Sequence, residues 1–147
     1  MSSKIRTILL AEDNPLDAEL ALDALREARL ANPVAHAVDG ADALDWLRRE
    51  GAYAGRPKGD PAVVLLDIKM PRMDGLEVLR AMREDEKLRH IPVVILSSSR
   101  EESDLVRSWD LGVNAYVVKP VDVRQFFEAV QTLGHFWAVL NEPAIAD

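Results

Sequence analysis

The feature that most constrains this chain is an apolar run that stops on a single acid. Residues 63–66 are all valine or leucine, Asp67 follows them, and the pairs Met70-Pro71 and Asp74-Gly75 come soon after. Such a run is typical of a strand buried on both faces of a parallel sheet. The proline and glycine pairs predict a turn before a helix. Because open α/β sheets bind ligands at the carboxyl ends of their strands, Asp67 is the first candidate functional residue.

Short apolar runs alternate with longer amphipathic segments, the pattern of consecutive βαβ units. The expected strands are residues 6–11, 34–38, 62–67, 92–97 and 115–119. Helices are expected from Pro15 to about residue 30, from about 40 to about 50, and after the capping residues Asp74, Ser99 and Asp122. Residues 51–60 are expected to form a surface loop. Right-handed crossovers then predict an α/β, flavodoxin-like (βα)5 doubly wound sandwich with parallel strand order 2-1-3-4-5.

The composition fits one globular domain and excludes several functions. The 147 residues contain no cysteine, which excludes disulfides and thiolate chemistry and is consistent with a cytoplasmic protein. We expect no signal peptide and no membrane span, because no apolar run approaches about 20 residues. The net charge of −7 argues against a nucleic-acid partner.

Polar side chains follow four of the expected strands at their carboxyl ends. They are Glu12 and Asp13 after the first strand, Asp67 after the third, Ser97 on the fourth and Lys119 on the fifth. Clustered carboxylates repel one another unless a cation compensates them, and Mg²⁺ prefers carboxylate, water and phosphate oxygens. Lys119 adds a positive point charge suited to a phosphate. The set favours phosphoryl chemistry in which Asp67 attacks in line.

Each of these residues also has a purely structural explanation. An acid pair after a strand often only opens a helix, and Asp74 is expected to cap one. Ser97 alone is more often a turn residue, and Lys119 alone more often a solvated strand end. Compatible chemistry at four separate strand ends is what favours a functional site.

The chain resembles the receiver domains of two-component response regulators, of the stand-alone kind that lacks an output domain. The resemblance covers residues 6–127 and makes residues 128–147 a C-terminal helix or tail extension of a single domain. It rests on Glu12-Asp13, Asp67-x-x-Met70-Pro71-x-Met73-Asp74-Gly75, Ser97 after an apolar strand, and Tyr116-x-x-Lys119-Pro120.

The resemblance implies that Asp67 is the phosphoacceptor and receives its phosphoryl group from a sensor histidine kinase. The protein is then a switch and not an enzyme, since it catalyses only its own phosphotransfer and autodephosphorylation. Glu12, Asp13, Asp67 and the backbone carbonyl of Lys69 are the implied ligands of Mg²⁺ or Mn²⁺.

The resemblance also assigns the parts of the switch. Lys119 pairs with the phosphoryl group, Ser97 moves inward to donate a hydrogen bond to it, and Tyr116 fills the space that Ser97 leaves. Pro120 follows a cis peptide bond. Two charge-assisted hydrogen bonds of about 1.5–3 kcal/mol each approach the roughly 5.5 kcal/mol that inverts a 1:99 equilibrium. The signal is expected to leave through the helix after Ser99, the strand 115–119 and the helix after Asp122.

Three alternatives compete with this assignment. A Mg²⁺-dependent phosphohydrolase of the haloacid-dehalogenase type needs a second acid two residues after its nucleophile, where this chain has Lys69. A flavin-binding protein needs a phosphate loop where Glu12 and Asp13 repel phosphate. A degenerate, unphosphorylated adaptor usually lacks part of the acid, serine and lysine set, which this chain retains.

A narrower resemblance concerns regulators that partner phytochrome-type histidine kinases. It rests on the loop 51–57, on Leu96-Ser97-Ser98-Ser99 and on the pair Phe136-Trp137. It implies a bacteriophytochrome as the kinase and red light as the signal.

Apolar residues near the end of the chain suggest self-association. Leu105 and Trp109 stand four apart and share one helix face. A helix over residues 122–140 would be longer than a typical strand of the sheet that it covers. Phe136 and Trp137 would then lie on the part of the helix that extends past the sheet. We therefore expect a homodimer with Leu105, Trp109, Phe136 and Trp137 at its interface. Alternatively, Gly134 ends this helix and the tail folds back onto its own domain.

Overall fold

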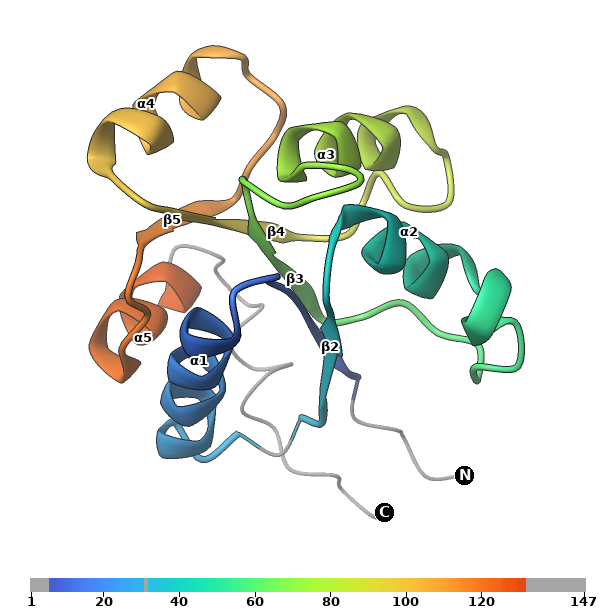
Figure 1. The fold of residues 1–147 in the computed structure, drawn as a ribbon, viewed down its shortest axis with the longest axis horizontal. Helices are drawn as coiled ribbons and strands as arrows, with labels where there is room; N and C mark the ends of the chain where they lie inside the picture. Colours follow the sequence, from blue (N-terminus) through green and yellow to red (C-terminus); the bar gives the residue numbers. More distant parts are fainter. Residues whose placement is uncertain (1–5, 31, 132–147) are drawn as a thin grey trace.

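Figure 1 shows a central sheet with helices on both of its faces, in a computed structural model that describes residues 6–30 and 32–131. The strands are β1 (Ile8–Ala11), β2 (Val34–Ala37), β3 (Val63–Asp67), β4 (Val93–Ser97) and β5 (Ala115–Val118). The helices are α1 (Pro15–Glu27), α2 (Gly40–Arg48), α3 (Gly75–Glu84), α4 (Arg100–Ser108) and α5 (Val123–Gln131), with a short 3₁₀ helix η1 (Gly51–Tyr53).

The sheet has the order β2-β1-β3-β4-β5, and every neighbouring pair is parallel. The predicted fold class and strand order are therefore confirmed. In the register, Ala11 lies beside Leu66, Asp67 beside Leu96, and Ser97 beside Val118. The carboxyl ends of β1, β3, β4 and β5 consequently share one rim of the sheet.

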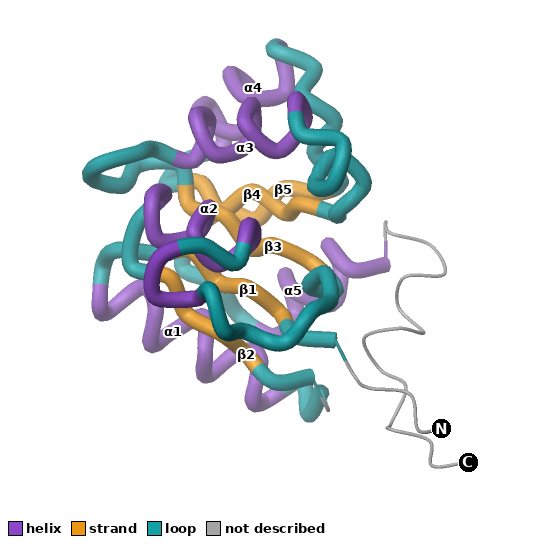
Figure 2. Tube along the Cα trace, turned by 90° about the vertical axis from the view of Figure 1, so that its right-hand side faces the viewer, coloured by secondary structure: helices purple, strands orange, loops and turns teal. Residues whose placement is uncertain are grey.

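Two apolar layers bury the two faces of the sheet. Side chains of α1 and α5, including the fully buried Phe126, pack on one face, while α2, α3 and Val106 of α4 pack on the other. Figure 2 shows α3 and α4 on the side of the sheet opposite α1. Every residue of β3 and β4 is buried, as expected for strands covered on both faces.

The helices begin where the sequence places caps. The Asn14 side chain accepts a hydrogen bond from the backbone N–H of Asp17, and Pro15 occupies the first turn of α1. Asp74 and Glu77 form a reciprocal capping box at α3. These caps matter for the site because they start α1 two residues after Asp13 and α3 eight residues after Asp67.

Some boundaries differ from the expected ones. α1 ends at Glu27 and not near residue 30, because Arg29 adopts a left-handed conformation with φ of 56°. The expected surface loop 51–60 contains the 3₁₀ turn η1. The expected continuation of the last helix to residue 140 lies outside the described residues. Among residues 6–30 and 32–131, no helix is long and apolar enough to cross a membrane.

Candidate functional site

Three carboxylates meet where β1 and β3 end. Oxygen atoms of Glu12, Asp13 and Asp67 all lie within 4.8 Å of one another. Glu12 is 1% exposed and Asp67 3% exposed, whereas Asp13 is open to solvent. The Glu12 side chain accepts a hydrogen bond from the backbone N–H of Asn14, at 3.1 Å, which fixes it at the start of α1. The structure thus brings together the acids that the sequence placed at one rim.

Lys119 reaches this cluster from the end of β5. Its Nζ lies 3.0 Å from Asp67 Oδ1, 3.2 Å from Glu12 Oε1 and 2.9 Å from Asp17 Oδ2. The side chain of Lys119 is 15% exposed. The ammonium group of Lys119 therefore contacts three carboxylates at once.

The electrostatics of the cluster follow from burial. Burial raises the pKa of the Glu12 carboxyl to about 7, and the neighbouring Asp67 adds to this effect. Burial also raises the pKa of Asp67, although Lys119 opposes the change. For Lys119, burial alone lowers the pKa, but its hydrogen bonds to Asp17 and Asp67 raise it above the ordinary value. One ammonium therefore leaves the carboxylates incompletely compensated, and a second cation fits this site.

The acid set fits a hard divalent metal ion. Two buried carboxylates and one exposed carboxylate offer oxygen ligands on one side, and the open side at Asp13 leaves room for water or phosphate oxygens. The side chain of Lys69, two residues after Asp67, points to other partners: its Nζ lies 3.6 Å from Glu102 and is largely exposed. Glu102 also accepts hydrogen bonds from the backbone and hydroxyl of Ser98.

The loop between β3 and α3 is held against the start of α2 by hydrogen bonds and close packing. Arg72 has φ of 64° and donates two hydrogen bonds to Asp39, at 2.6 and 2.9 Å. Asp39 is buried and caps α2 through the N–H of Asp42. Gly40 lies so close to this loop that a Cβ there would stand 1.9 Å from the carbonyl oxygen of Met73. These contacts fix the loop that leaves Asp67.

Ser97 and Tyr116 contact α4. The Ser97 hydroxyl is hydrogen bonded to the hydroxyl of Ser103, with an Oγ–Oγ distance of 2.5 Å. Tyr116 is half-buried, and the guanidinium of Arg107 lies 4.3 Å from the centre of its ring. Within the described part of the chain, Ser97 makes no hydrogen bond to Asp67. The peptide bond before Pro120 is cis.

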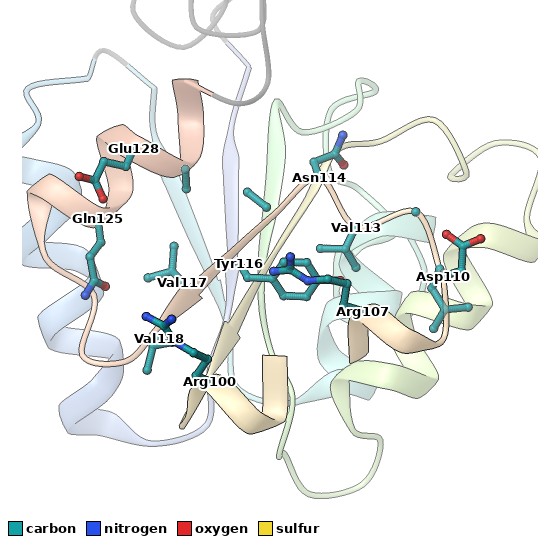
Figure 3. A pocket seen from close by; sticks show the side chains of 14 residues that line it. Arg100, Arg107, Asp110, Val113, Asn114, Tyr116, Val117, Val118, Gln125 and Glu128 are labelled. Carbon is teal, nitrogen blue, oxygen red and sulfur yellow. The ribbon is translucent and has the colours of Figure 1, made fainter. Parts of the chain in front are cut away.

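The side of the molecule formed by α4, β5 and α5 carries an open hollow of about 630 Å³ (Figure 3). Leu105 on α4 is 53% exposed and Trp109, the C-cap of this helix, is 39% exposed, while Val106 between them is buried in the core. The guanidinium of Arg80 lies 5.2 Å from the Trp109 ring. Phe136 and Trp137, the other expected interface residues, lie outside the described residues.

Sequence patterns alone do not point to Asp17 and Ser103. Asp17 lies three residues after the cap Asn14, where an acidic side chain ordinarily interacts with the positive end of the helix dipole. Because this role explains the acid without any further partner, the sequence does not indicate its contact with Lys119. Ser103 lies in mid-helix, and only the packing of α4 on β4 shows that it meets Ser97.

Comparison with known proteins gives the class to which this fold and acid cluster belong. The sequence profile of the response regulator receiver domain matches residues 8–131. Response regulator Rcp1 of Synechocystis sp. is 34% identical over 136 residues, which is 92% of this chain and 91% of the relative. The chain belongs to the response regulator receiver domain family and is a phosphoacceptor protein rather than a catalytic enzyme.

Solved structures narrow the relationship within the family. The bacteriophytochrome response regulator AtBRR is 62% identical with a TM-score of 0.89, covering 95% of this chain and 100% of that chain. The bacteriophytochrome response regulator RtBRR is 56% identical with a TM-score of 0.90, covering 95% of this chain and 84% of that chain. A Mn²⁺-bound form of Rcp1 is 32% identical, has a TM-score of 0.73, and covers 97% of this chain and 99% of that chain. The chain is therefore closely related to bacteriophytochrome response regulators.

Proposed function

We propose that this protein accepts a phosphoryl group on Asp67 from a phosphohistidine of a sensor histidine kinase. The observation that carries the proposal is the position of the Asp67 carboxylate. It is buried at the rim of the sheet, 3.0 Å from Lys119 Nζ and within 4.8 Å of two further carboxylates. A buried acid with a cation on one side and metal-ligand oxygens on the other is suited to in-line attack on phosphorus.

The transfer follows from these positions. A carboxylate oxygen of Asp67 attacks the phosphorus, a P–O bond forms, and the P–N bond to the imidazole breaks. The electron pair of that bond stays on the imidazole nitrogen, which takes up a proton. Lys119 stays beside Asp67 and neutralises a phosphoryl oxygen. Glu12, Asp13 and Asp67, together with the backbone carbonyl of Lys69, would hold Mg²⁺ or Mn²⁺, and the bound ion would further neutralise the transferring oxygens.

Phosphorylation then changes the surface of α4, β5 and α5. The new group adds about −1.5 to −2 charges and three strong hydrogen-bond acceptors beside Lys119. Ser97 leaves its partner on α4 and donates to the phosphoryl group, and Tyr116 follows into the vacated space. Because both residues contact α4, this helix and its neighbours transmit the change to a protein target.

The kinase is proposed to be a bacteriophytochrome that operates in the cytoplasm. The identities of 62% and 56% to bacteriophytochrome response regulators support this partner. A phosphotransfer assay with a purified bacteriophytochrome kinase tests this pairing, and we expect the kinase to phosphorylate the protein in a light-dependent way. A kinase that labels itself but never this protein, in red or far-red light, contradicts it.

We also propose that the chain is a single receiver domain with a C-terminal extension, and that it forms a homodimer. The exposed side chains of Leu105 and Trp109 support an interface on the side of α4, β5 and α5. The proposed interface also includes Phe136 and Trp137, which lie outside the described residues. Sedimentation velocity of the full chain is expected to give a dimer that Trp109→Ala weakens. A monomer at every concentration contradicts this part of the proposal.

Intact mass spectrometry after incubation with acetyl phosphate and Mg²⁺ tests the central proposal. The wild-type protein is expected to gain one phosphoryl group only when Mg²⁺ is present, and Asp67→Asn to gain none. Asp104→Asn is the matched control, because Asp104 is an exposed acid on α4 outside the carboxylate cluster. A wild-type protein that gains no phosphoryl group, beside a receiver that does, indicates an unphosphorylated adaptor instead.

A further inference from the structure

Helix α4 holds both proposed switch residues in their present positions. Ser103 of α4 shares a hydrogen bond with Ser97 at the end of β4, and both residues are buried, Ser103 with 4% and Ser97 with 0% of its surface exposed. One helical turn later, Arg107 lies across the ring of Tyr116 on β5 (Figure 3). Residues four apart share one face of a helix, so a single face of α4 contacts the two residues.

The hydrogen bond between Ser97 and Ser103 holds the Ser97 side chain toward α4, and either hydroxyl can be its donor. Among the described residues, Ser97 in this position makes no hydrogen bond to Asp67. A Ser97 hydroxyl that moves inward to an oxygen on Asp67 moves away from Ser103 and breaks this contact. The contact belongs only to the resting arrangement, and its strength sets part of the free energy of switching.

Ser103 has a replacement partner when Ser97 leaves. Its backbone N–H bonds to the carbonyl of Ser99, which is the cap residue of α4, at 3.2 Å. A serine hydroxyl inside a helix can bond to the carbonyl four residues earlier, and here this is the same carbonyl of Ser99. Breaking the contact with Ser97 therefore does not leave the Ser103 hydroxyl without a partner.

We infer that Ser103 is a positioning residue that holds Ser97 in the resting arrangement and thereby limits how readily the protein enters its phosphorylated state. The inference rests on the proposed function, because it requires phosphorylation of Asp67. In Ser103→Ala the resting state leaves the buried Ser97 hydroxyl without its partner, whereas the phosphorylated state loses only a hydrogen bond within α4. A difference of about one net hydrogen bond between the two states changes their equilibrium about fivefold. Removing the Ser103 hydroxyl thus favours the phosphorylated arrangement by about this factor.

The test compares phosphorylation of wild type, Ser103→Ala and Ser108→Ala at a series of acetyl phosphate concentrations with fixed Mg²⁺. Ser108 is the matched control, because it is an exposed serine on the same helix whose hydroxyl bonds to the carbonyl of Leu105. Ser103→Ala is expected to reach half-maximal phosphorylation at about fivefold lower acetyl phosphate, while Ser108→Ala matches wild type. Ser103→Thr keeps a hydroxyl and is expected to restore wild-type behaviour.

A second comparison separates an effect through Ser97 from a general change in the fold. In a Ser97→Ala background, Ser103→Ala is expected to have no further effect on the phosphorylation curve. An equal shift in that background overturns the inference. Ser103→Cys serves if the alanine variant does not fold, since it keeps the volume, weakens the hydrogen bond and is expected to give a smaller shift of the same sign.

The outcomes distinguish the inference from the function on which it rests. If wild type is phosphorylated and Ser103→Ala behaves like Ser108→Ala, the inference fails and the proposed function stands. If wild type is not phosphorylated under conditions that label another receiver, the proposed function fails.

Discussion

Gly75 begins α3 with its Cα directly against the backbone that leaves Asp67. A Cβ at this position would stand 2.1 Å from the carbonyl oxygen of Asp67 and 2.9 Å from the Cα of Ile68. Both distances are far below the 3.4 Å at which ordinary van der Waals contact begins. Both obstructing atoms belong to the backbone, so no side chain can turn aside. Alanine at position 75 must therefore move the loop that leaves Asp67 away from the start of α3.

The expected cost has two parts. Overpacking of a well-packed site costs about 1–3 kcal/mol. The backbone hydrogen bond from the N–H of Gly75 to the carbonyl of Ile68, 2.7 Å long, is strained or lost with a net cost of about 1 kcal/mol. Gly75→Ala is thus expected to lower the free energy of unfolding by about 2–4 kcal/mol, which for a domain of this size lowers the Tm by roughly 5–15 °C.

Urea unfolding followed by circular dichroism measures this change. Gly55→Ala is the matched control, because a Cβ at Gly55 meets no atom within 4 Å and its φ lies outside the left-handed region. The control is expected to remain within about 0.5 kcal/mol of wild type. Gly75→Ala is also expected to bind Mg²⁺ more weakly, since the displaced loop follows Asp67 directly and carries Lys69. If Gly75→Ala and Gly55→Ala have equal unfolding free energies, the tight contact at Asp67 is refuted.

Three further predictions concern the charges of the site. Because burial raises the pKa of Glu12 to about 7, protons compete with Mg²⁺ there. Mg²⁺ affinity measured by calorimetry is expected to fall as the pH drops from about 8 to 6, and an equally steep fall in Glu12→Gln would contradict the assignment. Without metal, the folded state holds a proton that the unfolded state has lost, so the free energy of unfolding falls as the pH rises from 4.5 to about 7. Lys119→Met is expected to bind Mg²⁺ more tightly, because the Lys119 ammonium competes with the metal for Asp67 and Glu12. The same variant is expected to be phosphorylated more slowly, because the ammonium also neutralises the phosphoryl oxygens. Weaker Mg²⁺ binding by this variant would contradict the competition between the ammonium and the metal.

The fold and the acid cluster are predictable from the sequence because both depend on regular structure. Apolar runs and caps define five βα units, and parallel pairing then brings the strand ends to one rim. Asp67 and Lys119 end up 3.0 Å apart although 52 positions separate their numbers, and no detailed geometry is needed to expect them together. The narrower likeness to phytochrome-linked regulators, expected from short motifs, agrees with the identities to AtBRR and RtBRR.

The contacts that tune the site are not predictable in this way. The pair of Arg72 and Asp39 depends on a left-handed residue in a loop, which the local sequence does not specify. The bond between Ser97 and Ser103 depends on the rotation of α4 on the sheet, and a shift of one residue would expose Ser103. Helices and strands can be predicted from the pattern of apolar and capping residues along the sequence. Contacts between side chains of different elements depend on how those elements pack in three dimensions.

The measurement that tests the central claim most directly is the location of the phosphoryl group. Acyl phosphates are reduced by borohydride, which converts a phosphorylated aspartate to homoserine that peptide mass spectrometry can locate. Four carboxylates lie close together here, so location matters as much as labelling: Glu12, Asp13, Asp17 and Asp67. Homoserine at position 67 alone, formed only with Mg²⁺ present, is the predicted result. A reduced residue at any of the other three positions, with Asp67 intact, would contradict the account.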